Sequence, residues 1–292
     1  MLHTVDGAAP PTPTPDPGWD AFFAQVNGVV AAHSVVTGNR YCEWFAEGAA
    51  TREQVRDLIQ QFSVFSNLFI VAQLLKTINA PNQQAARQSC EILANELGVV
   101  FNSGRTSPRP SHGNAEDLDR IGDPELVSTE GTVDGGTYRF DARHFEWLVR
   151  VGEAVDLRFE ELGKRRFGRG ETLFFTDELA RIYGGDDVDI AEGASFAVEH
   201  WAAAGFWKQL IAGLDAFRGR ECPELRLAFF TWHDRVEDQH AMHTTDELRQ
   251  AHTRPGFNEA KFLIGAREML DGVMAFWDGL EKHRLELENG GG

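Results

Sequence analysis

The segment AFFTWHDRVEDQH, residues 228–240, places His233, Glu237 and His240 at spacings of four and three residues. At about 100° per residue, Glu237 lies roughly 40° from His233 around a helix and His240 roughly 20° in the other direction, so the three side chains share one stripe. Charged stripes are usually solvated, but the apolar residues of AFFTW favour a buried helix. A buried carboxylate between two imidazoles is costly unless it is paired or coordinated. The stripe could therefore hold a metal ion, provided that other segments supply further ligands.

Three other segments carry an acid or an imidazole in apolar helical surroundings: Glu96 in CEILANELGVV, His144 in FDARHFEWLVR and Glu199 in EGASFAVEHWAAAGFW. Each has a purely structural alternative. Glu96 would be a surface acid near a helix end, His144 a core histidine hydrogen-bonded to the backbone, and Glu199 an acid paired with Arg or Lys. Together with the stripe they amount to three carboxylates and three imidazoles. This donor mixture suits non-heme iron or manganese better than structural zinc.

Several other chemistries lack their sequence signals. Of the two Glu-x-x-His pairs that a ferritin-like site needs, only Glu237 with His240 is present. Zincin, nucleophile-elbow, P-loop and Rossmann motifs are absent, and Cys42, Cys90 and Cys222 have no metal-binding or CxxC spacing. A net charge of -17 argues against nucleic acid and anionic membranes as partners. The basic cluster GKRRFGRG is expected to be a solvated loop.

The periodicity that must position these residues is helical nearly throughout. We predict a Pro-rich leader over residues 1–17, then one all-α domain over 18–287 with a long loop insertion at about 99–139, which is either functional or disordered. Thr51 with Gln54 predicts a capping box. Helices are predicted near 18–35, 39–47, 52–78, 81–97, 140–162, 174–183, 189–216, 223–249 and 257–286, with Pro81 and Pro223 at two starts and Gly98 at one end.

Apolar runs such as NLFIVAQLL are shorter than a bilayer span, and the first residues do not form a signal peptide. The prediction is a cytoplasmic protein without membrane association. The aromatic residues near the candidate ligands are expected to pack in the core rather than to line a pocket; they are Trp201, Phe206, Trp207, Phe229 and Trp232.

In order and spacing, the motifs NELG, ARHFEWL, AVEHWAAAGFW and HDRVEDQH resemble those of the heme-oxygenase-like diiron oxidases and oxygenases, often labelled iron-containing redox enzymes. The segment YCEWFAEGAATREQVRDLIQQF also looks like the early helices of that fold, so the resemblance runs from about residue 20 to 285. Its most specific part is the final H-x3-[D/E]-x2-H motif. The resemblance implies a seven-helix bundle, a fold shared with thiaminase-type proteins and pyrroloquinoline quinone synthase.

The resemblance further implies two Fe(II) ions per chain and O2 as co-substrate, used to oxidise a small organic molecule in specialised metabolism. Amino-acid-like or carboxylate substrates undergoing N-oxygenation, desaturation or C–C cleavage are the expected chemistry. Glu199 and Glu237 would act in catalysis as well as in metal binding, and a homodimer is possible for such a protein. The ligand set carried over is Glu96, His144, Glu199, His233, Glu237 and His240.

This chain departs from the family pattern in three places. Glu237 stands where the family usually has Asp, and the 99–139 loop separates Glu96 from His144, which makes His112 a rival to His144. No carboxylate lies between Asp57 and Glu91, where some members have an additional ligand.

Two other functions fit the same bundle. One is a noncatalytic binding or scaffold protein with a degenerate metal site, and the other is a cofactorless, thiaminase-like enzyme. Iron stoichiometry after anaerobic reconstitution separates the scaffold from the oxidase. Activity that survives a chelator would identify the cofactorless enzyme.

Overall fold

A computed structural model describes residues 17–100, 137–138 and 140–290 of the chain. Within these ranges the side chains of residues 100, 137–138, 140, 236–244, 246–247 and 290 are not described. Most of the predicted leader and of the predicted 99–139 loop therefore lies outside the described residues. The described part is helical apart from two short strands and connecting turns.

The helices follow one another along the chain as α1 (Pro17–Val30), α2 (Ser34–Thr37), α3 (Arg40–Ala46), α4 (Arg52–Ile78), α5 (Gln83–Glu96), α6 (His144–Ala154), α7 (Gly170–Gly184), α8 (Val188–Ala202), α9 (Phe206–Glu221), α10 (Ala228–His252) and α11 (Glu259–Gly290). Short 3-10 turns lie at Phe140–Ala142, Phe159–Glu161 and Arg165–Phe167. The predicted all-α fold is confirmed.

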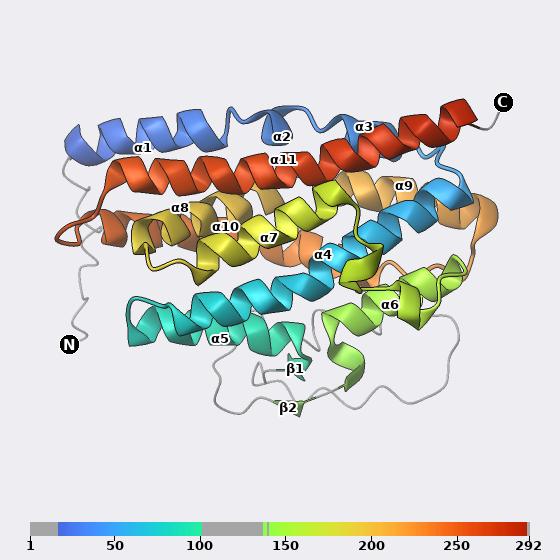
Figure 1. Cartoon of the computed structure of the whole chain (residues 1–292), viewed down its shortest axis with the longest axis horizontal. Coiled ribbons are helices and arrows are strands. Elements are labelled where there is room, and N and C mark those ends of the chain that lie inside the picture. Colours follow the sequence, from blue (N-terminus) through green and yellow to red (C-terminus); the bar gives the residue numbers. More distant parts are fainter. Residues whose placement is uncertain (1–16, 101–136, 139, 291–292) are drawn as a thin grey trace, which may run out of the picture.

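These helices form a bundle along the axis of α11, the longest helix (Figure 1). α11 packs most extensively on α8 and α7, while α1 and α3 lie along its outer side. α4 packs on α7 and α5, and α10 packs on α8, α9 and α6. Buried side chains from every described α-helix except α5 form one hydrophobic cluster, and the five aromatic residues expected in the core all belong to it.

Local sequence signals explain several boundaries. Thr51 and Gln54 form the predicted capping box at the start of α4, with Thr51 Oγ1 accepting from Gln54 N at 3.3 Å and Gln54 Oε1 accepting from Thr51 N at 2.9 Å. Gly98 follows α5 with a φ of 90°. Pro81 lies outside the helix that it was predicted to start, because the side chain of Asn82 caps α5 by accepting from Ala85 N.

Four further predictions about helix boundaries were wrong. The 18–35 helix ends at Val30, and His33 caps the separate α2. The 140–162 helix spans only α6, because the chain turns at Asp156, whose φ is 64°. The 189–216 helix is two helices, since Gly205 with a φ of 101° breaks the run between α8 and α9. Pro223 lies in a turn that the hydrogen bond from Leu225 N to Cys222 O closes, and α10 begins only at Ala228.

Two features of the packing bear on the site. A two-stranded antiparallel ladder joins β1 (Val99–Val100) to β2 (Thr137–Tyr138), with Val99 opposite Tyr138. The ladder closes the base of the long insertion, so the end of α5 and the start of α6 are brought together. α8 and α11 approach closely at Gly193, where an added Cβ would collide with the carbonyl of Phe262.

Among the described residues, α4 is the one helix long and apolar enough to cross a bilayer by length and composition. Three of its glutamines, Gln54, Gln61 and Gln73, are nonetheless buried, and the helix packs against five α-helices of the described part of the chain. These properties are typical of a core helix in a folded bundle. The cytoplasmic location stays a prediction.

Candidate metal centre

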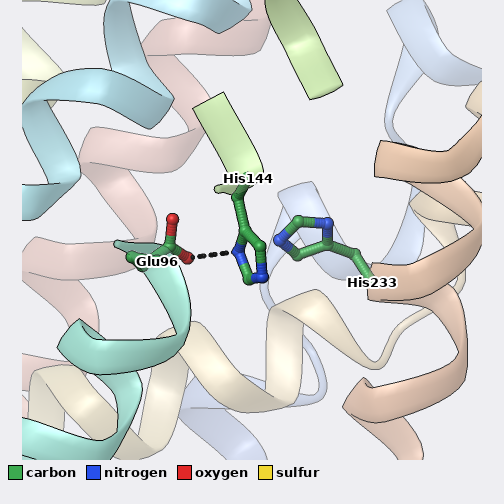
Figure 2. Close-up of side chains that lie close together, drawn as sticks. All are labelled: Glu96, His144 and His233. Carbon is green, nitrogen blue, oxygen red and sulfur yellow. Dashed lines mark hydrogen bonds and ion pairs between the residues drawn. The ribbon is translucent and has the colours of Figure 1, made fainter. Parts of the chain in front are cut away.

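Three of the predicted ligands converge in the described part of the chain. Glu96 is the last residue of α5, His144 is the first residue of α6, and His233 lies in the second turn of α10. One ligand atom from each lies within 4.8 Å of the other two. Figure 2 shows the carboxylate of Glu96 and the ring of His233 on opposite sides of the His144 ring. A carboxylate and two imidazoles thus meet from helices that are distant in the sequence.

Glu96 and His144 form a buried pair. Nδ1 of His144 lies 3.0 Å from Oε1 of Glu96, and the two residues are 1% and 9% exposed, respectively. The partner on Nδ1 fixes the orientation of the imidazole and leaves Nε2 on the other side of the ring. A carboxylate that orients a metal-binding histidine in this way is a common second partner in metal sites. Glu96 can therefore serve either as a direct ligand or as the group that aims His144.

The second imidazole is oriented by its own helix. Nδ1 of His233 donates to the carbonyl oxygen of Phe229, one turn earlier, at 2.6 Å. A proton on Nδ1 places the lone pair of the neutral ring on Nε2, the atom that a metal would use. His144 has a complementary feature, because its Nε2 is buried and has no hydrogen-bond partner in the described residues. Both rings thus have one nitrogen engaged in an orienting interaction.

The electrostatics of Glu96 favour an anion in the cluster. Burial would raise the pKa of this carboxyl, but the charge and hydrogen bond of His144 and the charge of His233 outweigh it, so the pKa of Glu96 is lowered. The carboxylate form is therefore maintained at neutral pH. The positive charges that lower this pKa are those of protonated imidazoles, and a divalent cation bound to the neutral rings would take their place beside the carboxylate.

Large aromatic rings surround the two imidazoles. The ring centroid of Trp232 lies 4.2 Å from that of His144, and the ring of Trp147 stacks on His144 at a centroid distance of 5.1 Å. Trp207 stacks on His233 at 4.8 Å with an interplanar angle of 22°. These rings exclude water and hold the imidazoles in place, which strengthens electrostatic interactions within the cluster.

The other predicted ligands are not part of this cluster of described side chains. Glu199, on α8, is half-buried and lies outside it. Glu237 and His240 belong to α10, but their side chains lie outside the described ones. His112, the rival to His144, also falls outside the described residues.

The structure adds a polar group that the sequence reasoning missed. Nζ of Lys76 donates to Oγ of Ser195 at 2.7 Å and lies 5.3 Å above the ring of Tyr183. Burial and then the charge of Glu199 raise the pKa of Tyr183. A signal was present in the sequence, because Lys76 is the single charged residue between Asp57 and Arg87.

The donors present fit a divalent metal. Two histidines and one carboxylate are the ligand set of many non-heme Fe(II) oxygenases, and catalytic zinc sites use the same combination. The orphaned, buried Nε2 of His144 is the observation that supports this fit, since buried polar atoms are almost always satisfied.

Comparison with known proteins identifies the fold. No protein-family model and no curated protein matches the chain. Among solved structures it is similar to a CADD-like protein of unknown function from Nostoc punctiforme, with 15% identity, a TM-score of 0.58 and coverage of 94% of this chain and 98% of that chain. A domain of unknown function with a heme oxygenase-like fold from Shewanella denitrificans gives 12% identity and a TM-score of 0.59, over 93% and 95% of the two chains.

A third similar structure is a TenA homolog from Pseudomonas syringae, with 12% identity, a TM-score of 0.59 and coverage of 90% and 93%. At such low identity these similarities establish the fold alone. The chain has the heme-oxygenase-like fold over nearly its whole length, as the sequence motifs predicted.

Proposed function

We propose that this chain is a non-heme diiron oxidase or oxygenase that uses O2 to oxidise a small organic substrate. Amino acids and other carboxylates are the substrate classes to test first, with N-oxygenation, desaturation or C–C cleavage as the reaction. The observation that carries the proposal is the convergence of Glu96, His144 and His233 in a buried cluster. Support also comes from the fold, which matches the one that the motifs imply.

The first iron would be held by His144 and His233, with Glu96 as a ligand or as the orienting partner of His144. Bound Fe(II) supplies a site at which O2 is activated. The chain's own contribution is to fix both imidazoles through the Glu96 carboxylate and the Phe229 carbonyl. Preset ligand geometry lowers the cost of ordering the site when the metal binds.

The second iron would be held by Glu199, Glu237 and His240. His240 and Glu237 share a helix with His233, and the spacings of four and seven residues from His233 are those from which the sequence predicts a single stripe. Glu199 is on α8, which packs against α10. We assign Glu199 to this second set of ligands, because its carboxylate would offset part of the charge of a bound cation.

The test is iron binding followed by O2 consumption. Purified apoprotein is reconstituted anaerobically with Fe(II), and bound iron is measured per chain after gel filtration. O2 uptake is then recorded with a panel of amino acids, fatty acids and matched decarboxylated analogues. About two iron ions per chain and substrate-dependent O2 uptake that a chelator abolishes would support the diiron enzyme.

Other results decide against the proposal. A chain that binds no iron is the scaffold protein with a degenerate site. Turnover of a substrate without O2 uptake, unaffected by the chelator, identifies a cofactorless enzyme. The TenA homolog of similar fold would then be the structure to compare with this chain.

The Glu199→Gln variant tests the assignment of the second site. The substitution keeps the side-chain volume and removes the charge, so iron content should fall from about two ions to about one per chain. Glu192→Gln is a matched control on the same helix, since Glu192 pairs with Arg254 away from the cluster. Full iron content in Glu199→Gln would refute the role of Glu199 as a ligand.

A further inference from the structure

A continuous series of aromatic rings leads from the candidate metal centre toward the surface. Trp207, on α9, stacks on the ligand His233 at 4.8 Å. The ring of Phe206 lies 4.4 Å from Trp207 and 5.6 Å from Trp277, which is on α11. Phe206 thus bridges the two indoles, and all three side chains are at least nine-tenths buried.

The series continues to α3, on the outer side of the bundle (Figure 1). The ring of Tyr41 lies 5.8 Å from Trp277 and 5.4 Å from Trp44. Trp44 is partly exposed, and the guanidinium of Arg284 sits 4.5 Å from its ring. Among the described rings, Trp277 is the junction that connects the aromatic residues near His233 to Tyr41 and Trp44.

Packing alone does not account for the choice of tryptophan along this series. The indole N–H groups of Trp207 and Trp277 are buried and have no hydrogen-bond acceptor in the described residues, and the same holds for Trp201 and Trp232. A buried donor without a partner costs about 1–3 kcal/mol, which phenylalanine would avoid. Trp147 differs, because its N–H donates to the carbonyl of Asp141 at 2.7 Å. Repeated unsatisfied groups of this kind call for a functional explanation, of which redox chemistry is one.

We propose that Trp207, Trp277 and Trp44 form an electron relay that protects the metal centre when O2 reacts in the absence of a correctly bound substrate. The proposal rests on the proposed function, since the oxidant is generated by iron and O2. Indoles are among the most readily oxidised side chains, and the bridging rings of Phe206 and Tyr41 keep the successive steps short.

The electron balance is closed by a reductant in solution. Reduction of O2 to two molecules of water takes four electrons and four protons, and two Fe(II) ions supply two of the electrons. A substrate normally supplies the other two. Without it, Trp207 gives up one electron at a time, Trp277 refills Trp207, and Trp44 refills Trp277. A thiol or ascorbate reduces Trp44 at the surface, and water supplies the protons.

The buried indoles pass electrons without moving protons. Since the N–H groups of Trp207 and Trp277 have no acceptor, an oxidised ring keeps its proton until an electron returns. Trp44 is the one member of the relay that is open to solvent, so irreversible oxidation should accumulate there when the reductant is absent.

The experiment compares the wild-type chain with Trp277→Phe, which breaks the relay but retains an aromatic ring. Each protein is loaded anaerobically with Fe(II) and mixed with O2, catalase and no substrate. Samples frozen at early times are examined by electron paramagnetic resonance for a tryptophan radical, and oxidised tryptophans are located by peptide mass spectrometry. Trp19→Phe is the matched control, because Trp19 is a buried residue of α1 with no ring contact to the series.

In the wild type we expect a tryptophan radical and oxidation at Trp44, which added ascorbate suppresses. In Trp277→Phe, oxidation at Trp44 should fall to the level of the metal-free protein and rise at Trp207, and ascorbate should no longer protect. Trp44→Phe is a second variant, at a partly exposed position, in which oxidised tryptophan should be found at Trp277. Iron content and circular dichroism verify that each variant is folded and loaded.

The outcomes separate the two proposals. Equal oxidation of Trp44 in the wild type and in Trp277→Phe would overturn the relay, as would an unmodified Trp44 in a wild type that binds iron and consumes O2. A wild type that binds no iron or consumes no O2 overturns the proposed function, and the relay with it.

Discussion

The contact between Glu96 and His144 leads to a quantitative prediction for metal binding. Glu96→Gln keeps the size of the side chain but removes the charge that lies 3.0 Å from Nδ1 of His144. Whether Glu96 binds the metal directly or orients His144, its loss should weaken the first metal site. Changes to an orienting carboxylate typically cost 10–100-fold in metal affinity.

The size of the effect follows from linkage between binding and folding. At a metal concentration of about 100 times the wild-type Kd, binding stabilises the folded chain by about 2.7 kcal/mol. A 10–100-fold weaker site gains only about 1.4 to 0.4 kcal/mol at the same concentration. At about 2.1 cal/mol/K of unfolding entropy per residue, 1 kcal/mol corresponds to about 1.6 °C in Tm for a chain of 292 residues. The metal-dependent rise in Tm of Glu96→Gln should therefore be smaller by about 2–4 °C.

The assay is thermal unfolding followed by circular dichroism, with and without Co(II) as an air-stable substitute for Fe(II). Glu91→Gln is the control, because it makes the same change on α5 outside the cluster. Without metal, Glu96→Gln should lose about 1 kcal/mol, since a neutral hydrogen bond replaces a charge-assisted one. An unchanged metal-dependent rise in Tm would refute the role of Glu96.

The remaining predictions concern the metal helix, the helix packing and pH. His233→Ala should bind less iron and lose O2-dependent activity while keeping its helical circular dichroism; full iron content would mean that α10 does not carry the site. Gly193→Ala should lower the Tm strongly, because its Cβ would collide with the Phe262 carbonyl, whereas Gly28→Ala, with open space around it, should stabilise α1 by up to about 1 kcal/mol. Burial and the Arg169 guanidinium lower the pKa of His283. Just below about pH 6.5 the unfolded chain therefore binds more protons than the folded chain, so the free energy of unfolding should decrease as the pH is lowered. The free energy of unfolding, measured with denaturant at several pH values, should change less with pH in His283→Gln than in the wild type. The same pH dependence in both proteins would refute this assignment.

The lowered pKa of His283 has a geometric basis in a cluster that joins three parts of the chain. Nδ1 of His283 accepts a hydrogen bond from the guanidinium of Arg169 at 2.8 Å, which favours the neutral imidazole. Asp57 pairs with the same guanidinium, and its Oδ2 lies 3.1 Å from Nδ1. The Asp57 charge is thus compensated mainly by Arg169, so its approach to His283 is not an ion pair at neutral pH.

Local features of the sequence determined most of the helices and the class of the fold. The capping box of Thr51 and Gln54 depends on residues three positions apart, and the apolar periodicity of α4 and α10 depends on neighbours one turn away. Such signals can be interpreted without the rest of the chain. They were insufficient where one residue decided a boundary, as at Gly205, whose left-handed backbone separates α8 from α9.

The convergence of the site depended on tertiary structure. Glu96 and His144 are 48 positions apart, and the ladder between β1 and β2 together with the packing of α5, α6 and α10 brings them to His233. The contact of Lys76 with Ser195, 119 positions away, likewise had no counterpart in local sequence. Residue types and spacing indicated which side chains could bind a metal, because ligand chemistry belongs to the side chain. Their distances were decided by the packing of helices far apart in the chain, which depends on the complementary shapes of many side chains at once.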